Sequence, residues 1–198
     1  AAATISFESA PFVAVGATGD VAASASSGET VVFSSTTEAV CTVDGETVTG
    51  VTAGTCVISG SAPEGANYLA AGPTTQSFAV GKGVQTIVFG EAPAVVVAGT
   101  GDVSATTVST SEVTSTSQTS DVCTIWGATV TGVTAGTCVI RGNAVADANY
   151  NAAAPAEQSI TLGKGAQTVA FTSGAPVDAV VDGAEYSPAA SGGASTAP

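Results

Sequence analysis

The chain of 198 residues contains one sequence unit written twice, and this duplication constrains its fold more than any other feature. Residues 4–83 align with residues 86–165 at a fixed offset of 82 without a gap, and over half of the aligned positions are identical. The best-preserved stretch, TVTGVTAGTCVI, occupies residues 47–58 and returns unchanged at 129–140. Because self-similarity at a fixed period indicates repeated structural units, we expect each copy to fold as one small domain.

The repeats predict a division of the chain into three segments. Residues 1–83 and 84–165 are two complete repeats, and residues 166–198 contain the opening strands of an incomplete third repeat. An isolated pair of strands is only marginally stable in water. We therefore expect that the chain is a segment of a longer array, or that these strands complete a partner chain by strand addition.

Within each repeat the apolar residues follow the period of β-strands. Ile5 and Phe7 alternate with polar neighbours, as do Cys56 and Ile58, and no helical apolar stripe persists for three turns. Turn residues recur at intervals typical of short strands, and Asp44-Gly45 is a hairpin signal because glycine readily adopts a positive φ. About seven short strands per repeat predict an all-β protein made of tandem β-sandwiches.

The composition excludes several classes of function. The chain carries 3 basic and 16 acidic residues, a net charge of −13, and no histidine. Without histidine, the usual zinc sites and the Ser-His and Cys-His nucleophile systems are excluded, so we expect neither enzymatic activity nor a cofactor. An anionic surface cannot supply the Lys and Arg contacts that dominate nucleic-acid affinity, so no nucleic-acid partner is expected. The carboxylates are scattered and predict no metal site, with calcium at a domain junction as the lesser alternative.

The apolar stretches are too short for a membrane span. The longest, such as residues 94–98, fall far below the 18 or more residues that a spanning helix requires. The first residues lack the regions of a secretory signal, which we expect to have been removed or to lie outside this sequence. The Ser-, Thr-, Ala- and Val-rich composition and the evenly spaced cysteines favour an oxidising compartment, which predicts an extracellular or cell-surface location.

Both repeats resemble a known family of surface modules. In the same order they contain Thr-Ile-x-Phe, a proline, a Gly-rich turn, Val-Cys-Thr, the TVTGVTAGTCVI stretch, Ala-Asn-Tyr and a closing Gly-Lys-Gly. This order is similar to the tandem bacterial immunoglobulin-like repeats of large secreted and surface-attached proteins, and it implies tandem immunoglobulin-like sandwiches. Such modules serve as spacers, stalks, fibre subunits and adhesive segments, so the resemblance leaves the function open among these.

The four cysteines are candidates for structural disulfides. Their equal spacing favours pairing within repeats, Cys41 with Cys56 and Cys123 with Cys138, out of three possible connectivities. The resemblance implies that the partners lie on facing sheets. Closing a loop of about 15 residues stabilises a domain by roughly 3 kcal/mol. A redox-active pair is the disfavoured alternative, because the chain has no Cys-x-x-Cys motif.

Two differences between the repeats single out candidate interface residues. Trp126 replaces Asp44 at the predicted hairpin tip, and Ser115 replaces Phe33, which removes inward volume if the strand register is kept. One hypothesis is that Trp126 folds back over the resulting gap. The other is that Trp126 projects and packs against another domain or chain, where tryptophan is enriched.

The connectors and the repeated tyrosines also suggest roles. Lys82 and Lys164 lie between glycines at equivalent connectors. A lysine in a connector is badly placed to form an isopeptide cross-link, because such a cross-link requires a buried lysine. We interpret both lysines as solvated charges that face an acidic neighbouring domain.

Tyr68 and Tyr150 are expected to be half-buried rings whose hydroxyls hold a backbone group.

Together these features predict a structural role. The short connector 81–83 leaves little slack, so consecutive domains should stack end to end as a rod. We expect a non-catalytic segment of an extracellular stalk, adhesin shaft or filament, whose partners are neighbouring repeats of the same or identical chains. The alternative is an accessory glycan- or receptor-binding module, for which Trp126, Asn143 and Asn151 are the only candidate binding residues.

Overall fold

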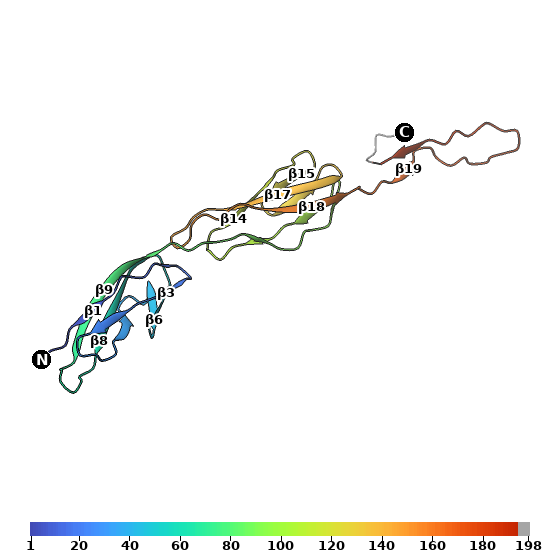
Figure 1. Ribbon diagram of the computed structural model, residues 1–198. Helices are drawn as coiled ribbons and strands as arrows, with labels where there is room; N and C mark the ends of the chain where they lie inside the picture. Colours follow the sequence, from blue (N-terminus) through green and yellow to red (C-terminus); the bar gives the residue numbers. More distant parts are fainter. Residues whose placement is uncertain (194–198) are drawn as a thin grey trace.

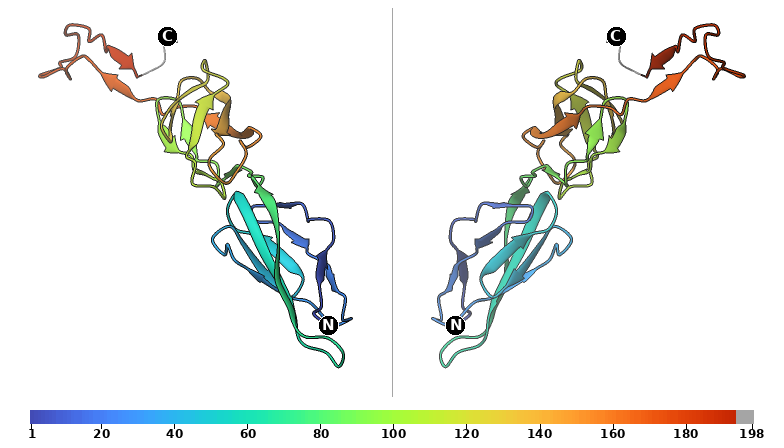
Figure 2. Two further views of the ribbon diagram at one scale, coloured as in Figure 1. Left: turned by 90° about the vertical axis from the view of Figure 1, so that its left-hand side faces the viewer. Right: turned by 90° about the vertical axis from the view of Figure 1, so that its right-hand side faces the viewer.

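The computed structural model describes residues 1–193; the last five residues of the segment 166–198 lie outside the described residues. Every regular element in this range is a β-strand, which confirms the all-β class. No helix long and apolar enough to cross a membrane occurs among residues 1–193. Figures 1 and 2 show two β-sheet bodies arranged in a row, followed by a long hairpin that extends beyond the second body.

The first repeat is a β-sandwich of two main sheets. A four-stranded sheet has the order β2-β9-β8-β5, a three-stranded sheet has the order β3-β7-β6, and β1 pairs with β4. Pro11 and the turn at Gly16, which has a φ of 77°, divide the N-terminal part into short strands, so the repeat has nine strands where about seven were expected. The strands are β1 (Ile5–Phe7), β2 (Val13–Ala14), β3 (Thr18–Asp20), β4 (Ala23–Ala25), β5 (Val32–Ser35), β6 (Cys41–Asp44), β7 (Thr47–Gly50), β8 (Gly54–Ala62) and β9 (Ala71–Gly81).

The second repeat reproduces this arrangement. Its sheets have the orders β11-β18-β17-β14 and β12-β16-β15, and β10 pairs with β13. The strands are β10 (Val88–Phe89), β11 (Val95–Val96), β12 (Thr100–Asp102), β13 (Ala105–Thr106), β14 (Val113–Ser117), β15 (Cys123–Trp126), β16 (Thr129–Gly132), β17 (Gly136–Ala144) and β18 (Ala156–Gly163).

Each repeat has its own hydrophobic core between its sheets. Alternating positions of the strands face inward, as the period-two pattern predicts. The core of the first repeat contains Val15, Val21, Cys41, Val48, Cys56, Ile58 and Val80. The core of the second repeat contains Val95, Val103, Cys123, Val130, Cys138, Ile140, Ile160 and Leu162.

The predicted hairpin is present, with its turn one residue later than expected. Asp44 pairs with Thr47, so the two loop residues are Gly45 and Glu46. Gly45 has a φ of 60°, which suits the first central position of a tight hairpin turn. The equivalent hairpin places Trp126 in strand β15 rather than in the loop.

The third segment forms only a two-stranded ribbon in the described range. Strand β19 (Val169–Phe171) pairs with β20 (Ala190–Gly192), as β1 pairs with β4 in the first repeat. All residues of both strands are exposed. The apolar side chains whose counterparts lie against the sandwich cores are therefore left in contact with solvent.

Candidate functional site

A disulfide joins the two main sheets of each sandwich. Cys41 on β6 is bonded to Cys56 on β8 with their Cα atoms 5.6 Å apart, and Cys123 is bonded to Cys138 with a separation of 5.7 Å. All four residues are fully buried. Each bridge therefore ties the three-stranded sheet to the four-stranded sheet in the middle of the core.

A threonine next to each bridge holds the same two strands together by hydrogen bonds. The Thr37 hydroxyl accepts the N–H of Val57 at 2.9 Å, and the Thr37 carbonyl accepts the N–H of Cys41 at 3.0 Å. Thr119 makes the equivalent bonds to Val139 and Cys123 in the second repeat. Both disulfides thus occupy the same hydrogen-bonded setting.

The junction between the repeats is hydrogen-bonded along the connector. Gly83 forms an isolated parallel bridge with Tyr150, which lies in the loop 145–151, the first part of the connection between β17 and β18. The N–H of Gly83 donates to the carbonyl of Asn149 at 2.8 Å, and the N–H of Asn151 donates to the carbonyl of Gly83 at 2.9 Å. The connector is therefore part of the second repeat and is not a free tether.

Side chains of the loop 145–151 reach back to the first repeat. The Oδ1 atom of Asn149 accepts the backbone N–H of Ala53 at 3.0 Å. The Nζ atom of Lys82 donates to the carbonyl of Asp147. Lys82 therefore contacts the second repeat at a backbone oxygen and is otherwise exposed to solvent.

The ring of Tyr150 packs against the core of the first repeat, across the junction. A Cβ atom on Gly83 would lie 2.5 Å from the Val15 carbonyl oxygen and 3.0 Å from the Tyr150 ring, so only glycine fits between them. The expectation that the hydroxyl holds a backbone group was wrong: within the described residues it makes no hydrogen bond, and the ring does the packing. The equivalent Tyr68, at the end of the first repeat away from the junction, is 37% exposed.

Asp147 shapes the loop that carries these contacts. Its Oδ1 atom accepts the N–H of Tyr150 at 2.7 Å and the N–H of Asn149 at 2.8 Å. These bonds stabilise the ionised carboxylate and hold the pKa of Asp147 below the usual 3.8. The hydrogen bond from the Tyr150 N–H is the largest cause of this lowering. The first repeat has Gly65 at the equivalent position.

Gln85 supports the same loop from inside the second repeat, and sequence reasoning missed it. Among residues 1–193, Gln85 is the one polar or charged residue that is buried. Its Nε2 atom donates to the carbonyls of Val145 at 3.0 Å and Asn151 at 2.7 Å, and its Oε1 atom accepts the Thr107 hydroxyl at 2.7 Å. The available signal was a break in the repeat, because the first repeat has Ala3 at this position.

Trp126 does not fold back over the gap left by Ser115, so this hypothesis was wrong. The side chain is 90% exposed and packs on neither repeat. Strand alternation explains this, because Cys123 and Ile125 face inward and Trp126 faces outward. Packing of Trp126 against another chain stays a prediction.

Lys164 is likewise exposed at the second connector.

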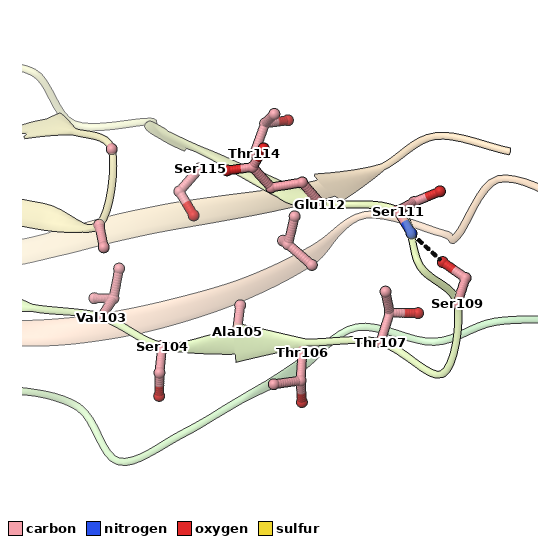
Figure 3. A pocket seen from close by; sticks show the side chains of 13 residues that line it. Val103, Ser104, Ala105, Thr106, Thr107, Ser109, Ser111, Glu112, Thr114 and Ser115 are labelled. Carbon is pink, nitrogen blue, oxygen red and sulfur yellow. Dashed lines mark hydrogen bonds between the residues drawn. The ribbon is translucent and has the colours of Figure 1, made fainter. Parts of the chain in front are cut away.

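The gap beside Ser115 is open as a cavity of about 650 Å³ in the second repeat. Ser115 opposes Gly142 in the sheet, as Phe33 opposes Gly60 in the first repeat, so the register is kept. Figure 3 shows Val103 and Ala105 on one side of this space and Ser115 on the other, with their side chains pointing toward one another.

The residues considered for glycan binding lie on different elements. Trp126 ends β15, Asn143 lies on β17, and Asn151 lies at the junction, where its Nδ2 atom donates to the Gly83 carbonyl. Within residues 1–193, no group of three or more His, Cys, Asp or Glu residues is arranged to hold a metal ion.

Comparisons with known proteins return only distant structural similarity. No family model matches the chain, and no curated protein sequence matches it. Among solved structures, domains 1–6 of the surface layer protein SbsC match with a TM-score of 0.35 and 15% identity, over 85% of this chain and 29% of that one. S-layer protein SbsC domains 4 and 5 match with a TM-score of 0.33 and 14% identity, over 82% of this chain and 98% of that one.

A third match, the S-layer protein rSbsC(31-844), has a TM-score of 0.35 and 16% identity, over 86% of this chain and 29% of that one. This chain thus spans less than a third of the longer SbsC structures. At these values the similarity assigns no function, and the all-β fold rests on the strands described above.

Proposed function

We propose that this chain is a structural, non-catalytic segment of an extracellular array, such as a stalk, an adhesin shaft or a filament. Residues 1–83 and 84–165 are its two immunoglobulin-like domains, and residues 166–198 open a third. The observation that carries the proposal is the hydrogen-bonded connector, in which Gly83 bonds to Asn149 and Asn151. The same loop also reaches the first repeat, where the Asn149 side chain accepts the N–H of Ala53, so the junction transmits orientation from one domain to the next, which a flexible tether cannot do.

The disulfides support a location outside the cell. Disulfides persist in oxidising compartments and are rare in reducing ones. Each repeat contains one buried bridge between its sheets, Cys41–Cys56 or Cys123–Cys138. A domain of this size has a small core, so a bridge contributes a large share of its stability.

The sequence of the second connector supports an extended array. Gly163-Lys164-Gly165 repeats the first connector, and Ala135 repeats Ala53, whose N–H receives the Asn149 side chain. A Cβ atom on Gly165 would lie 2.8 Å from the Val97 carbonyl oxygen, which matches the close approach of Gly83 to Val15. The far end of the second repeat therefore offers the same surface to a following domain.

Small-angle X-ray scattering of the full chain tests the proposal. We expect an elongated particle whose distance distribution has a sharp inter-domain maximum, because the two domains form one stiff unit. Tyr150→Ala removes the ring that packs across the junction and should broaden the distance distribution. Tyr68→Ala is the matched control, because the equivalent tyrosine of the first repeat lies away from this junction and its loss should leave the scattering unchanged. Wild-type domains that tumble independently would contradict a structural rod.

Exposed Trp126 favours a second candidate, an accessory glycan- or receptor-binding module. A glycan array that compares the wild type with Trp126→Ala separates the two functions. The rod predicts no saccharide binding by either protein, whereas the module predicts binding that the substitution removes.

A further inference from the structure

The cavity of the second repeat is an open slot whose size and chemistry suit an aromatic side chain. Its volume of about 650 Å³ falls within the range of roughly 300 to 1,000 Å³ in which proteins bind small ligands. Figure 3 shows Val103 and Ala105 on one side of the slot and Ser115 on the other. Glu112 also lines it, so hydrogen-bond acceptors lie next to apolar surface. An indole ring suits such a site, because its N–H needs an acceptor when the ring is buried.

The hairpin beside the slot presents an indole ring to solvent. Trp126 ends β15 and is 90% exposed, and the next two residues, Gly127 and Ala128, line the slot. Trp126 does not fill the slot of its own repeat, because it lies on the outer face of β15 while Ile125 faces inward. Burying an indole removes roughly 150 to 250 Å² from water, so its full exposure leaves a large gain unused.

The ring and the slot both arise where the second repeat departs from the first. The first repeat has Asp-Gly-Glu at residues 44–46, and the second has Trp-Gly-Ala at residues 126–128. In the core beside this hairpin, Ser115 replaces Phe33. The second repeat therefore has a projecting ring and a recess in one surface, where the first repeat has a carboxylate and a filled core position.

The same differences make this surface nearly neutral, although the whole chain carries −13. Residues 103–140 contain two charged side chains, Glu112 and Asp121, whereas the equivalent residues 21–58 contain four. Both carboxylates of the hairpin have been lost, which removes the repulsion that two copies would otherwise meet there. A basic partner would bind a surface that keeps its carboxylates, so a second neutral surface of the same kind is the better match.

A second copy of the chain carries both halves of the contact. In a dimer with a twofold axis, every contact across the interface occurs twice, so a ring and a recess in one surface are self-complementary. We propose that two copies pair through their second repeats, with Trp126 of each copy inserted into the slot beside Ser115 of the other. This contact joins two chains, goes beyond the junction within a chain, and does not depend on the array proposed above.

Sedimentation velocity and fluorescence of the full chain test the contact together. Trp126 is the only tryptophan, so tryptophan emission reports on this site alone. As the concentration rises from micromolar to millimolar, we expect the average mass to approach that of a dimer. The emission should move to shorter wavelength over the same range, and quenching by acrylamide should fall. A chain that stays monomeric, or a dimer in which Trp126 remains open to acrylamide, would overturn the proposal.

Two substitutions remove one half of the contact each. Trp126→Ala removes the ring at an exposed position, and Ser115→Phe fills the slot with the residue that the first repeat carries there, so neither should disturb the fold. Each should weaken association about tenfold or more, because a buried tryptophan is a frequent hot spot. Phe12→Ser is the matched control, since this 91% exposed ring lies on the first repeat and should leave association unchanged. Association that keeps its wild-type strength in either variant would contradict the contact.

A mixing experiment separates the contact from a folding defect. Ser115→Phe chains keep the ring, and Trp126→Ala chains keep the slot, so a mixed dimer forms one of the two contacts. We expect it to be weaker than the wild-type dimer and stronger than either variant with itself. Only the Ser115→Phe chain contains a tryptophan, and its emission should shift when the other variant is added. A mixture without heterodimer, or a Trp126 emission that responds to a saccharide and not to a second copy, would overturn the proposal.

Discussion

The Oδ1 atom of Asn149 accepts the backbone N–H of Ala53 at 3.0 Å across the boundary between the two repeats. Asn67 occupies the equivalent place in the first repeat, away from this junction, and is exposed. The same asparagine of the repeat is thus hydrogen-bonded across the junction as Asn149 and exposed to solvent as Asn67. This asymmetry makes a set of internally controlled experiments possible.

Asn149→Ala should loosen the junction, because it leaves the Ala53 N–H without its acceptor. A single hydrogen bond contributes about 0.5 to 1.5 kcal/mol, so we expect faster amide exchange at Ala53 by up to about tenfold. Hydrogen exchange measured by NMR gives the rate for that amide. Asn67→Ala is the control, and equal exchange rates at Ala53 in the wild type and the Asn149 variant would contradict the contact.

Gly83→Ala should disrupt the connector, because a Cβ atom there would lie 2.5 Å from the Val15 carbonyl oxygen. We expect altered amide shifts on both sides of the junction and a broader distance distribution in solution scattering. Gly81→Ala is the control two residues away, since its Cβ atom would lie 3.9 Å from the Val13 carbonyl oxygen, an ordinary contact. Identical behaviour of the two variants would show that the close approach has no consequence.

Gln85→Ala should destabilise the second repeat, because the carbonyls of Val145 and Asn151 and the Thr107 hydroxyl lose a buried partner. Leaving buried polar groups unpaired costs about 1 to 3 kcal/mol. Urea unfolding followed by the NMR signals of Ile140 and Ile160, which lie in the core of the second repeat, reports on this repeat. Gln167→Ala, at the equivalent but exposed position of the third segment, should leave the midpoint unchanged.

The loop 145–151 should respond to acid through Asp147. Its folded pKa lies below the usual 3.8, so the carboxylate stabilises the loop above the unfolded pKa, and this contribution is lost as the pH falls through the folded value. The amide signals of Asn149 and Tyr150 should shift together in an NMR titration over that acid range, and Asp147→Asn should remove the shift. Gly65 provides the internal control, because the Tyr68 amide has no such carboxylate.

Removing the bridge in one repeat should destabilise that repeat alone. The double variant Cys41→Ala/Cys56→Ala leaves no unpaired thiol and should lower the free energy of unfolding of the first repeat by about 3 kcal/mol. Thermal unfolding followed by calorimetry would then separate into two transitions. The NMR signals of Ile140 and Ile160, which lie in the core of the second repeat, should keep their wild-type midpoint. A shift of that midpoint would mean that the repeats unfold as one unit.

The strands and the all-β class could be predicted because alternation such as Ile5 and Phe7 is a local property of the sequence. The junction could not be predicted, because Tyr68 and Tyr150 look alike until a neighbouring domain is placed beside one of them. Gln85 was missed for a related reason: only the tertiary arrangement shows that three distant groups converge on it. Trp126 was misplaced because the turn lies one residue later than the Asp44-Gly45 signal suggested.

The parallel pairing of β2 with β9 determines how each domain bears a load. Val13 lies opposite Val80 and Ala14 opposite Gly81, with both strands running in the same direction. Tension that pulls the start of the chain one way and the following domain the other loads these hydrogen bonds in shear, so they must break together instead of unzipping one at a time. After such a rupture, the bridge between Cys41 and Cys56 would still keep the enclosed residues from lengthening. A single-molecule pulling record should therefore show a shorter extension per domain than the number of residues allows.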